Sequence, residues 1–109
     1  MRAVVFTLHA RGDLRRIMRF IARRSHSKAL AEDFIAGVLA RCYRMAARAT
    51  EVGRPRPDIG PGYRSLPFGR YIIIHRYDPH RLVIVRVLSA YLNAEPTAIR
   101  AGDDDPDGA

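Results

Sequence analysis

The second half of the chain, residues 53–93, constrains the fold most strongly. It begins with a loop rich in glycine and proline and ends with two apolar runs, at about residues 70–77 and 82–88, joined by a four-residue turn. Two apolar runs around a short turn predict a pair of antiparallel strands. Arginines stand at the ends of these runs and inside them. We therefore expect a small sheet with guanidinium groups set on or around it.

The start of the chain predicts a strand and then a helix. Residues 3–8 are mostly β-branched or aromatic, which favours a strand. Asp13 is expected to cap or charge-stabilise the start of the helix, and the helix should end near Arg24. The apolar face of this helix repeats at helical spacing and consists of Leu14, Ile17, Met18 and Ile21.

A second, longer helix is predicted after a short break at residues 25–27. Ser27 is a suitable N-cap for it. Its apolar stripe consists of Ala31, Phe34, Ile35, Val38, Leu39, Cys42, Met45 and Ala46. Because the break is short, we expect the two helices to pack as an antiparallel hairpin.

The segment between the helices and the two long strands should be irregular. Residues 51–62 are expected to be loop, because their prolines lack backbone donors and their glycines permit turns. A short strand at 63–66 and a turn at 67–69 are expected to follow.

The faces of the long strands can be assigned only in part. Alternation in the last strand places Val83, Val85 and Val87 on one face, which we expect to pack on the helices. Arg86 would then point from the opposite, more open face. For residues 70–77 two core sets remain open, one formed by Tyr71, Ile73 and His75 and the other by Ile72 and Ile74.

Charge narrows the classes of partner. The chain of 109 residues has a net charge of +8, and all but one of its 19 basic residues are arginine. Without the four aspartates of residues 101–109, the first 100 residues carry +12. Guanidinium groups bind carboxylates and phosphates in bidentate fashion, so nucleic acid and acidic protein both fit. A GC-rich genome could explain the preference for arginine over lysine, but it would not explain the net charge.

Length and composition favour one folded domain at residues 1–94, followed by a disordered acidic tail at 95–109. No apolar run reaches the roughly 20 residues that a membrane span needs. The single cysteine cannot form an internal disulfide, which is typical of a reducing compartment. We therefore expect a cytoplasmic protein without a membrane partner.

Several strings of the sequence resemble one family. They are Asp13-Leu14, Phe20-Ile21-Ala22, Gly53-Arg54, the string GPGYRS at residues 60–65, the string PFGRYII at 67–73 and the string IVRVL at 84–88. In this order they are similar to the RelE/ParE superfamily of type II toxins, and within it more to ParE. The resemblance covers about residues 3–92. It implies an α+β fold in which an N-terminal strand and an antiparallel helical hairpin pack on a small antiparallel sheet.

The resemblance also implies a function. ParE-like proteins are toxins of toxin-antitoxin systems, associated with plasmid stabilisation and with inhibition of DNA gyrase. A ParD-like antitoxin, acidic and partly disordered, would neutralise this chain in a hetero-oligomer. Two alternatives remain open: a metal-independent, ribosome-dependent mRNA endonuclease of the RelE kind, and an inactive homologue that only binds antitoxin. The inactive homologue is suggested by Ser89-Ala90-Tyr91, where ParE-like chains commonly read His-Gly-Arg.

The candidate site residues lie in and beside the strands. A ParE-like binding toxin would have no catalytic residue and would contact its target or partner through Arg64, Arg70, Arg86, Tyr91, Tyr63 and Phe68. If the chain is an RNase, Arg64, Arg70, Arg86 and Tyr91 should converge on one phosphate. The arginines would stabilise its charge, and Tyr91, His75 or His80 could move protons.

The remaining polar residues are interpreted more simply. We expect His75 to be satisfied by its neighbours in the strand, His80 to be solvated in a turn, and Cys42 to belong to the core. A solvated basic face is expected from the helix arginines Arg15, Arg16, Arg19, Arg23, Arg41 and Arg48. No spacing typical of metal ligands is present, so neither a metal nor a cofactor is expected.

Overall fold

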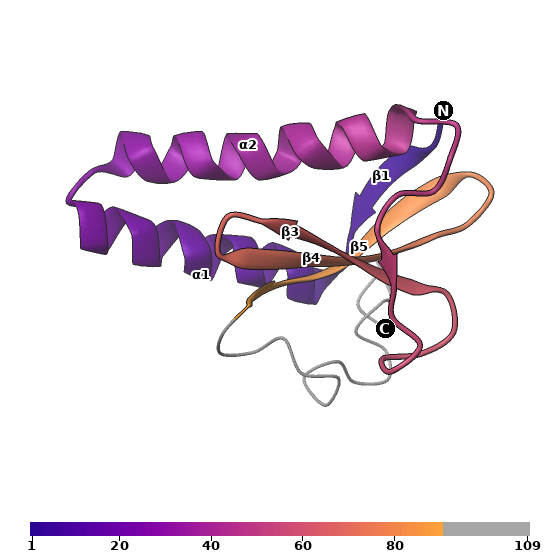
Figure 1. The fold of residues 1–109 in the computed structure, drawn as a ribbon. Helices are drawn as coiled ribbons and strands as arrows, with labels where there is room; N and C mark the ends of the chain where they lie inside the picture. Colours follow the sequence, from indigo (N-terminus) through magenta and orange to yellow (C-terminus); the bar gives the residue numbers. More distant parts are fainter. Residues whose placement is uncertain (91–109) are drawn as a thin grey trace.

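The computed structural model describes residues 1–90, which form a helical hairpin packed on a five-stranded sheet (Figure 1). In chain order the elements are β1 (Ala3–Phe6), α1 (Leu8–Ser25), α2 (Lys28–Ala47), β2 (Arg54–Pro55), β3 (Tyr63–Phe68), β4 (Tyr71–Tyr77) and β5 (Arg81–Ser89). The α+β class and the hairpin are as expected. The predicted tail at 95–109 lies outside the described residues.

The sheet is mixed, in the order β1-β5-β4-β3-β2. Strands β2 to β5 pair with antiparallel neighbours, whereas β1 lies parallel to β5, with Ala3 opposite Arg81. The helical hairpin follows β1 directly. The hairpin and the other three strands therefore lie between β1 and its neighbour β5 in the sequence.

Helix α1 begins earlier than its apolar pattern indicates. It starts at Leu8, and the strand before it ends at Phe6. The hydroxyl of Thr7 accepts a hydrogen bond from Ala10 N (3.0 Å) and donates one to Val85 O (2.7 Å). Thr7 is thus the N-cap and also ties the helix to β5. The prediction that Asp13 caps this helix is wrong, because Asp13 lies inside α1 and is buried.

The start of α2 is as predicted. The hydroxyl of Ser27 accepts a hydrogen bond from Leu30 N (3.1 Å), so Ser27 is the N-cap. The preceding residue, His26, has a φ of 53° and ends α1 in a left-handed conformation. This one residue reverses the chain and produces the antiparallel hairpin seen in Figure 1.

Two details of the loop and hairpin differ from expectation. The segment predicted to be loop contains β2, whose Arg54 and Pro55 pair with β3. Strand β3 runs to Phe68, so the turn into β4 consists of Gly69 and Arg70 rather than residues 67–69. The proline in this strand, Pro67, faces no further strand on its outer side, because β2 is only two residues long.

A β-bulge decides which face of β5 packs on the helices. Strand β4 pairs Ile74 with Arg86 but pairs the next residue, His75, with Ile84, so Val85 is an extra residue. The alternation changes phase there. The face toward the helices consists of Leu82, Ile84 and Val87, and the opposite face of Val83, Val85 and Leu88. The predicted all-valine face toward the helices is therefore wrong for two of its three members.

Strand β4 contributes to the apolar clusters on both faces of the sheet. Ile73 belongs to the cluster under the helices, where Tyr71 and Tyr77 pack beside it. Ile74 belongs to the second cluster, where Ile72 packs beside it. Both candidate core sets are therefore core, one on each face. No helix within residues 1–90 combines the length and apolar character needed to cross a membrane.

Candidate functional site

Arg86 does not point into open solvent, contrary to expectation. It turns to α1, where its Nε donates to Asp13 Oδ2 (2.8 Å) and its terminal nitrogen donates to Oδ1 (3.0 Å). The same carboxylate accepts from the backbone N of Val87 (3.0 Å) and from Arg16. The Asp13 side chain is only 3% exposed and the Arg86 side chain 13%. This bidentate pair therefore fastens α1 to the edge of β5 beyond the end of β1.

Arg64 is also engaged within the fold. Its guanidinium donates to Gly53 O (2.8 Å) and lies 3.6 Å from the Glu51 carboxylate. Arg64 is opposite His75 in the sheet, and the two side chains contact neighbouring carbonyl groups of the loop after α2, at Gly53 and Val52. Arg64 thus fixes the loop before β2 to the middle of the sheet.

The other candidate residues lie elsewhere. Arg70 is exposed in the β3–β4 turn, at the opposite end of this hairpin from Arg64. Tyr63 packs against the apolar cluster on the face away from the helices, whereas Phe68 packs edge-on against Phe34 of α2, with ring centroids 5.5 Å apart. Tyr91 lies outside the described residues. The structure therefore does not bring the described candidates together around one phosphate.

His75 is a buried histidine held by its neighbours, as expected. Its Nε2 lies 2.8 Å from Val52 O and its Nδ1 3.1 Å from Ile73 O. Burial lowers the pKa of His75 below the ordinary 6.5, although the two carbonyl contacts oppose this shift. The neutral ring has one N–H, so it can donate to only one of these two carbonyl oxygens.

Lowering the pH should destabilise the protein through His75. Because its folded-state pKa lies below 6.5, the unfolded chain binds the proton first as the pH falls through 6.5. We expect the free energy of unfolding to decrease below pH 6.5, by up to about 1.4 kcal/mol per pH unit, until the folded-state pKa is reached. Urea titrations at pH 7.5 and pH 5 measure this decrease.

The matched variant is His75→Gln, which keeps an amide donor but does not titrate. Its stability should change less between the two pH values than that of the wild type. The hydrogen bond from Arg56 lowers the pKa of Asp58 below 3.8, so this carboxylate does not titrate in the same range. An identical pH dependence in both proteins would contradict the assignment to His75.

Two further reactive groups of residues 1–90 are Cys42 and His80. Burial raises the pKa of the Cys42 thiol to about 12, so the thiol stays protonated inside the core. His80 is exposed in the turn before β5. Among residues 1–90, no three His, Cys, Asp or Glu side chains are grouped so that they could hold a metal ion.

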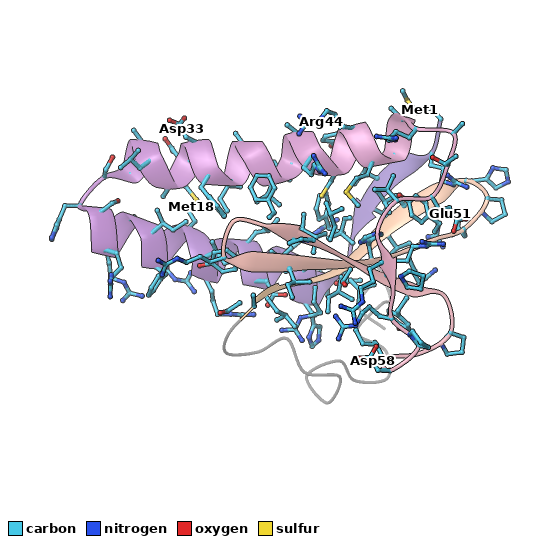
Figure 2. The ribbon with its side chains drawn as sticks, in the orientation of Figure 1. Met1, Met18, Asp33, Arg44, Glu51 and Asp58 are labelled. Carbon is cyan, nitrogen blue, oxygen red and sulfur yellow. The ribbon has the colours of Figure 1, made fainter. Side chains whose placement is uncertain are left out.

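Arginines with and without ion-pair partners are unevenly distributed over the fold. In the sheet and its loops, Arg2, Arg56, Arg64, Arg81 and Arg86 form ion pairs with carboxylates. Most arginines of the two helices, in contrast, have no such partner within residues 1–90. Within residues 1–90 no ion pair or hydrogen bond involves the side chains of Arg11, Arg15, Arg19 and Arg23 on α1 or of Arg41, Arg44 and Arg48 on α2. Figure 2 shows Arg44 on the side of α2 that faces away from the sheet.

The hairpin also exposes large apolar side chains. Phe20 on α1 is 50% exposed, and Leu30 and Tyr43 on α2 are 56% and 59% exposed. Phe20 lines a cavity of about 210 Å³ between α1 and the end of β5, together with Tyr71 and Ser89. Exposed apolar groups beside a cavity are typical of a surface that binds another protein.

Comparison with known proteins agrees with this architecture. No curated protein sequence matches the chain. A solved structure described as the chromosomal ParDE TA system from P. aeruginosa superimposes with a TM-score of 0.68 at 19% identity, over 82% of this chain and 96% of that one. The family model described as "ParE toxin of type II toxin-antitoxin system, parDE" matches residues 4–90. The chain therefore belongs to the ParE toxin family of type II toxin-antitoxin systems.

Proposed function

We propose that this toxin inhibits DNA gyrase and that binding of a ParD-like antitoxin neutralises it. The observation that carries the proposal is the match of the ParE family model to residues 4–90, which spans every helix and strand of the fold. A structural likeness to a ParDE system at a TM-score of 0.68 supports it. The toxin would act by binding, with no catalytic residue of its own.

The hairpin supports the antitoxin part of the proposal. Phe20, Leu30 and Tyr43 are exposed apolar side chains of the hairpin, and the cavity beside Phe20 can accept an anchoring side chain. An acidic antitoxin would complement the unpaired arginines of α2, Arg41 and Arg44. Covering these groups would also block any contact that the same surface makes with the target.

Expression of the chain in a bacterium tests the proposal. Expressed alone, the toxin should arrest growth and cause DNA breaks that depend on gyrase. Expressed together with the neighbouring open reading frame, it should copurify with the product and growth should recover. Cleavage of mRNA at the ribosomal A site, without DNA breaks, would contradict the gyrase assignment. Normal growth without the antitoxin would instead identify an inactive homologue.

The antitoxin surface can be tested separately. Phe20→Ser removes an exposed apolar group and should weaken the complex, whereas Leu8→Ser removes one that is 49% exposed but does not line the cavity. Pull-down with the tagged antitoxin compares the two variants. Equal retention of both would contradict a role for the cavity.

A further inference from the structure

Helix α1 carries a continuous row of arginines that the fold does not use. Arg11, Arg15, Arg19 and Arg23 recur every four residues, so they lie along one side of the helix. All four are exposed, and none of their side chains forms a hydrogen bond or ion pair with any residue in the range 1–90. Figure 2 shows nitrogen-tipped side chains that project from α1 on the side away from α2. We call these four residues the α1 arginine ridge.

Nothing else on α1 neutralises the ridge. The only acidic residue of this helix is Asp13, which is buried and already binds Arg86, Arg16 and the backbone N of Val87. Unneutralised charges of one sign on neighbouring turns repel one another and weaken an isolated helix. The repulsion along α1 is therefore not relieved within the fold. In the sheet and its loops, in contrast, carboxylates neutralise Arg56, Arg64 and Arg81.

The dimensions of the ridge suit a nucleic-acid backbone. Successive members are separated by about 6 Å along the axis, so the four residues span about 18 Å. One strand of B-form DNA has a phosphate every 3.4 Å of rise, so the ridge would run along about five phosphates. Protein interfaces, in contrast, have an apolar centre that is depleted of charge. The large exposed apolar groups Phe20, Leu30 and Tyr43 are not members of the ridge.

We propose that the α1 arginine ridge binds the sugar-phosphate backbone of duplex DNA. Guanidinium groups at regular intervals can each bind a phosphate of a regular backbone, and contacts to phosphates fix position without reading sequence. Such binding would hold the toxin on DNA and favour encounter with an enzyme that acts there. The inference does not depend on gyrase, because it concerns only this chain and DNA.

Salt dependence of binding tests the ridge. Fluorescence anisotropy with a labelled 20-base-pair duplex between 50 and 200 mM salt gives the slope of log affinity against log salt. Four phosphate contacts predict a slope of about −3.6, which corresponds to a fall in affinity of roughly 150-fold over this range. The triple variant Arg15→Gln, Arg19→Gln, Arg23→Gln should make the slope shallower by about 2.7.

A control with the same change in charge is available on α2. Arg41→Gln, Arg44→Gln, Arg48→Gln also removes three unpaired helix arginines and should change the slope by less than about 1. Circular dichroism and thermal melts verify that both triple variants are folded. Equal changes in the two variants would show a general effect of net charge and overturn the proposal.

Three further results would overturn it. The first is no binding of the duplex by the wild type at 50 mM salt. The second is tighter, ridge-dependent binding of single-stranded RNA than of duplex DNA. The third is a ridge variant that loses affinity for the acidic antitoxin but keeps its affinity for DNA. Because the assay contains neither gyrase nor ribosomes, its outcome is independent of the proposed target.

Discussion

Asp13→Ala is expected to destabilise the protein by about 3–5 kcal/mol, the cost typical of removing one partner from a buried ion pair. The substitution leaves Arg86, which is 13% exposed, without its carboxylate, and leaves the backbone N of Val87 without its acceptor. It also removes one of the ties between α1 and β5, the strand that pairs with both β1 and β4. Urea denaturation of the wild type and the variant measures the difference. A loss below about 1 kcal/mol would contradict this role.

Two controls separate the buried pair from a general effect of charge. Asp33→Ala removes an exposed carboxylate of α2 that has no ion pair within residues 1–90, and it should cost less than about 0.5 kcal/mol. Arg86→Met in the Asp13→Ala background removes the uncompensated charge, so the double variant should recover part of the stability. A double variant weaker than Asp13→Ala alone would show that Arg86 acts mainly through other contacts.

Gly53→Ala should cost about 3 kcal/mol, for two reasons. Gly53 has a φ of 110°, which residues with a Cβ adopt only with strain of about 1–2 kcal/mol. An added Cβ would also lie 2.8 Å from the His75 ring, which is held by its contact with Val52 O. Displacing the ring would break that hydrogen bond and leave buried polar groups unsatisfied. Thermal or urea unfolding of the variant measures the loss.

Gly62→Ala is the matched control. Gly62 also has a positive φ, 81°, but an added Cβ there would meet no atom within 4 Å. This variant should show only the backbone cost of about 1–2 kcal/mol. If the two alanine variants lose the same stability, the close approach of Gly53 to His75 does not contribute.

Local patterns predicted most of the elements and missed two that depend on distant residues. The N-cap at Ser27 and the two long strands followed from residues adjacent in sequence. The start of α1 did not, because Thr7 caps the helix while donating to Val85, a contact across 78 positions. The bulge at Val85 has no glycine or proline to mark it, so simple alternation assigned Val83 and Val85 to the wrong face.

Predicting the site was harder than predicting the fold. The sequence alone does not show whether a given arginine, in a strand or on a helix, has a partner within the fold. The pairing of Arg86 with Asp13 spans 73 positions, and that of Arg64 with Gly53 O depends on the path of a loop. Of the candidate arginines, Arg64 and Arg86 are therefore engaged in the fold, whereas Arg70 is exposed in the β3–β4 turn. Most of the arginines without an ion pair within residues 1–90 lie on the helices, where the sequence predicts only a solvated basic face.

The resemblance to the family nevertheless held, because it depends on the fold and not on those arginines. Gly53-Arg54 and the GRY segment at residues 69–71 form the loop and turn that shape the sheet, and Asp13 anchors the first helix to it. In this chain, several residues of the strings that resemble ParE have structural roles.

The most direct test of the proposed target uses purified gyrase, supercoiled plasmid and ATP with the purified toxin. We predict that the toxin increases the amount of cleaved plasmid covalently attached to gyrase, and that prior addition of the antitoxin prevents this increase. Unchanged supercoiling with no cleaved plasmid, from a toxin preparation that arrests growth in cells, would contradict the account.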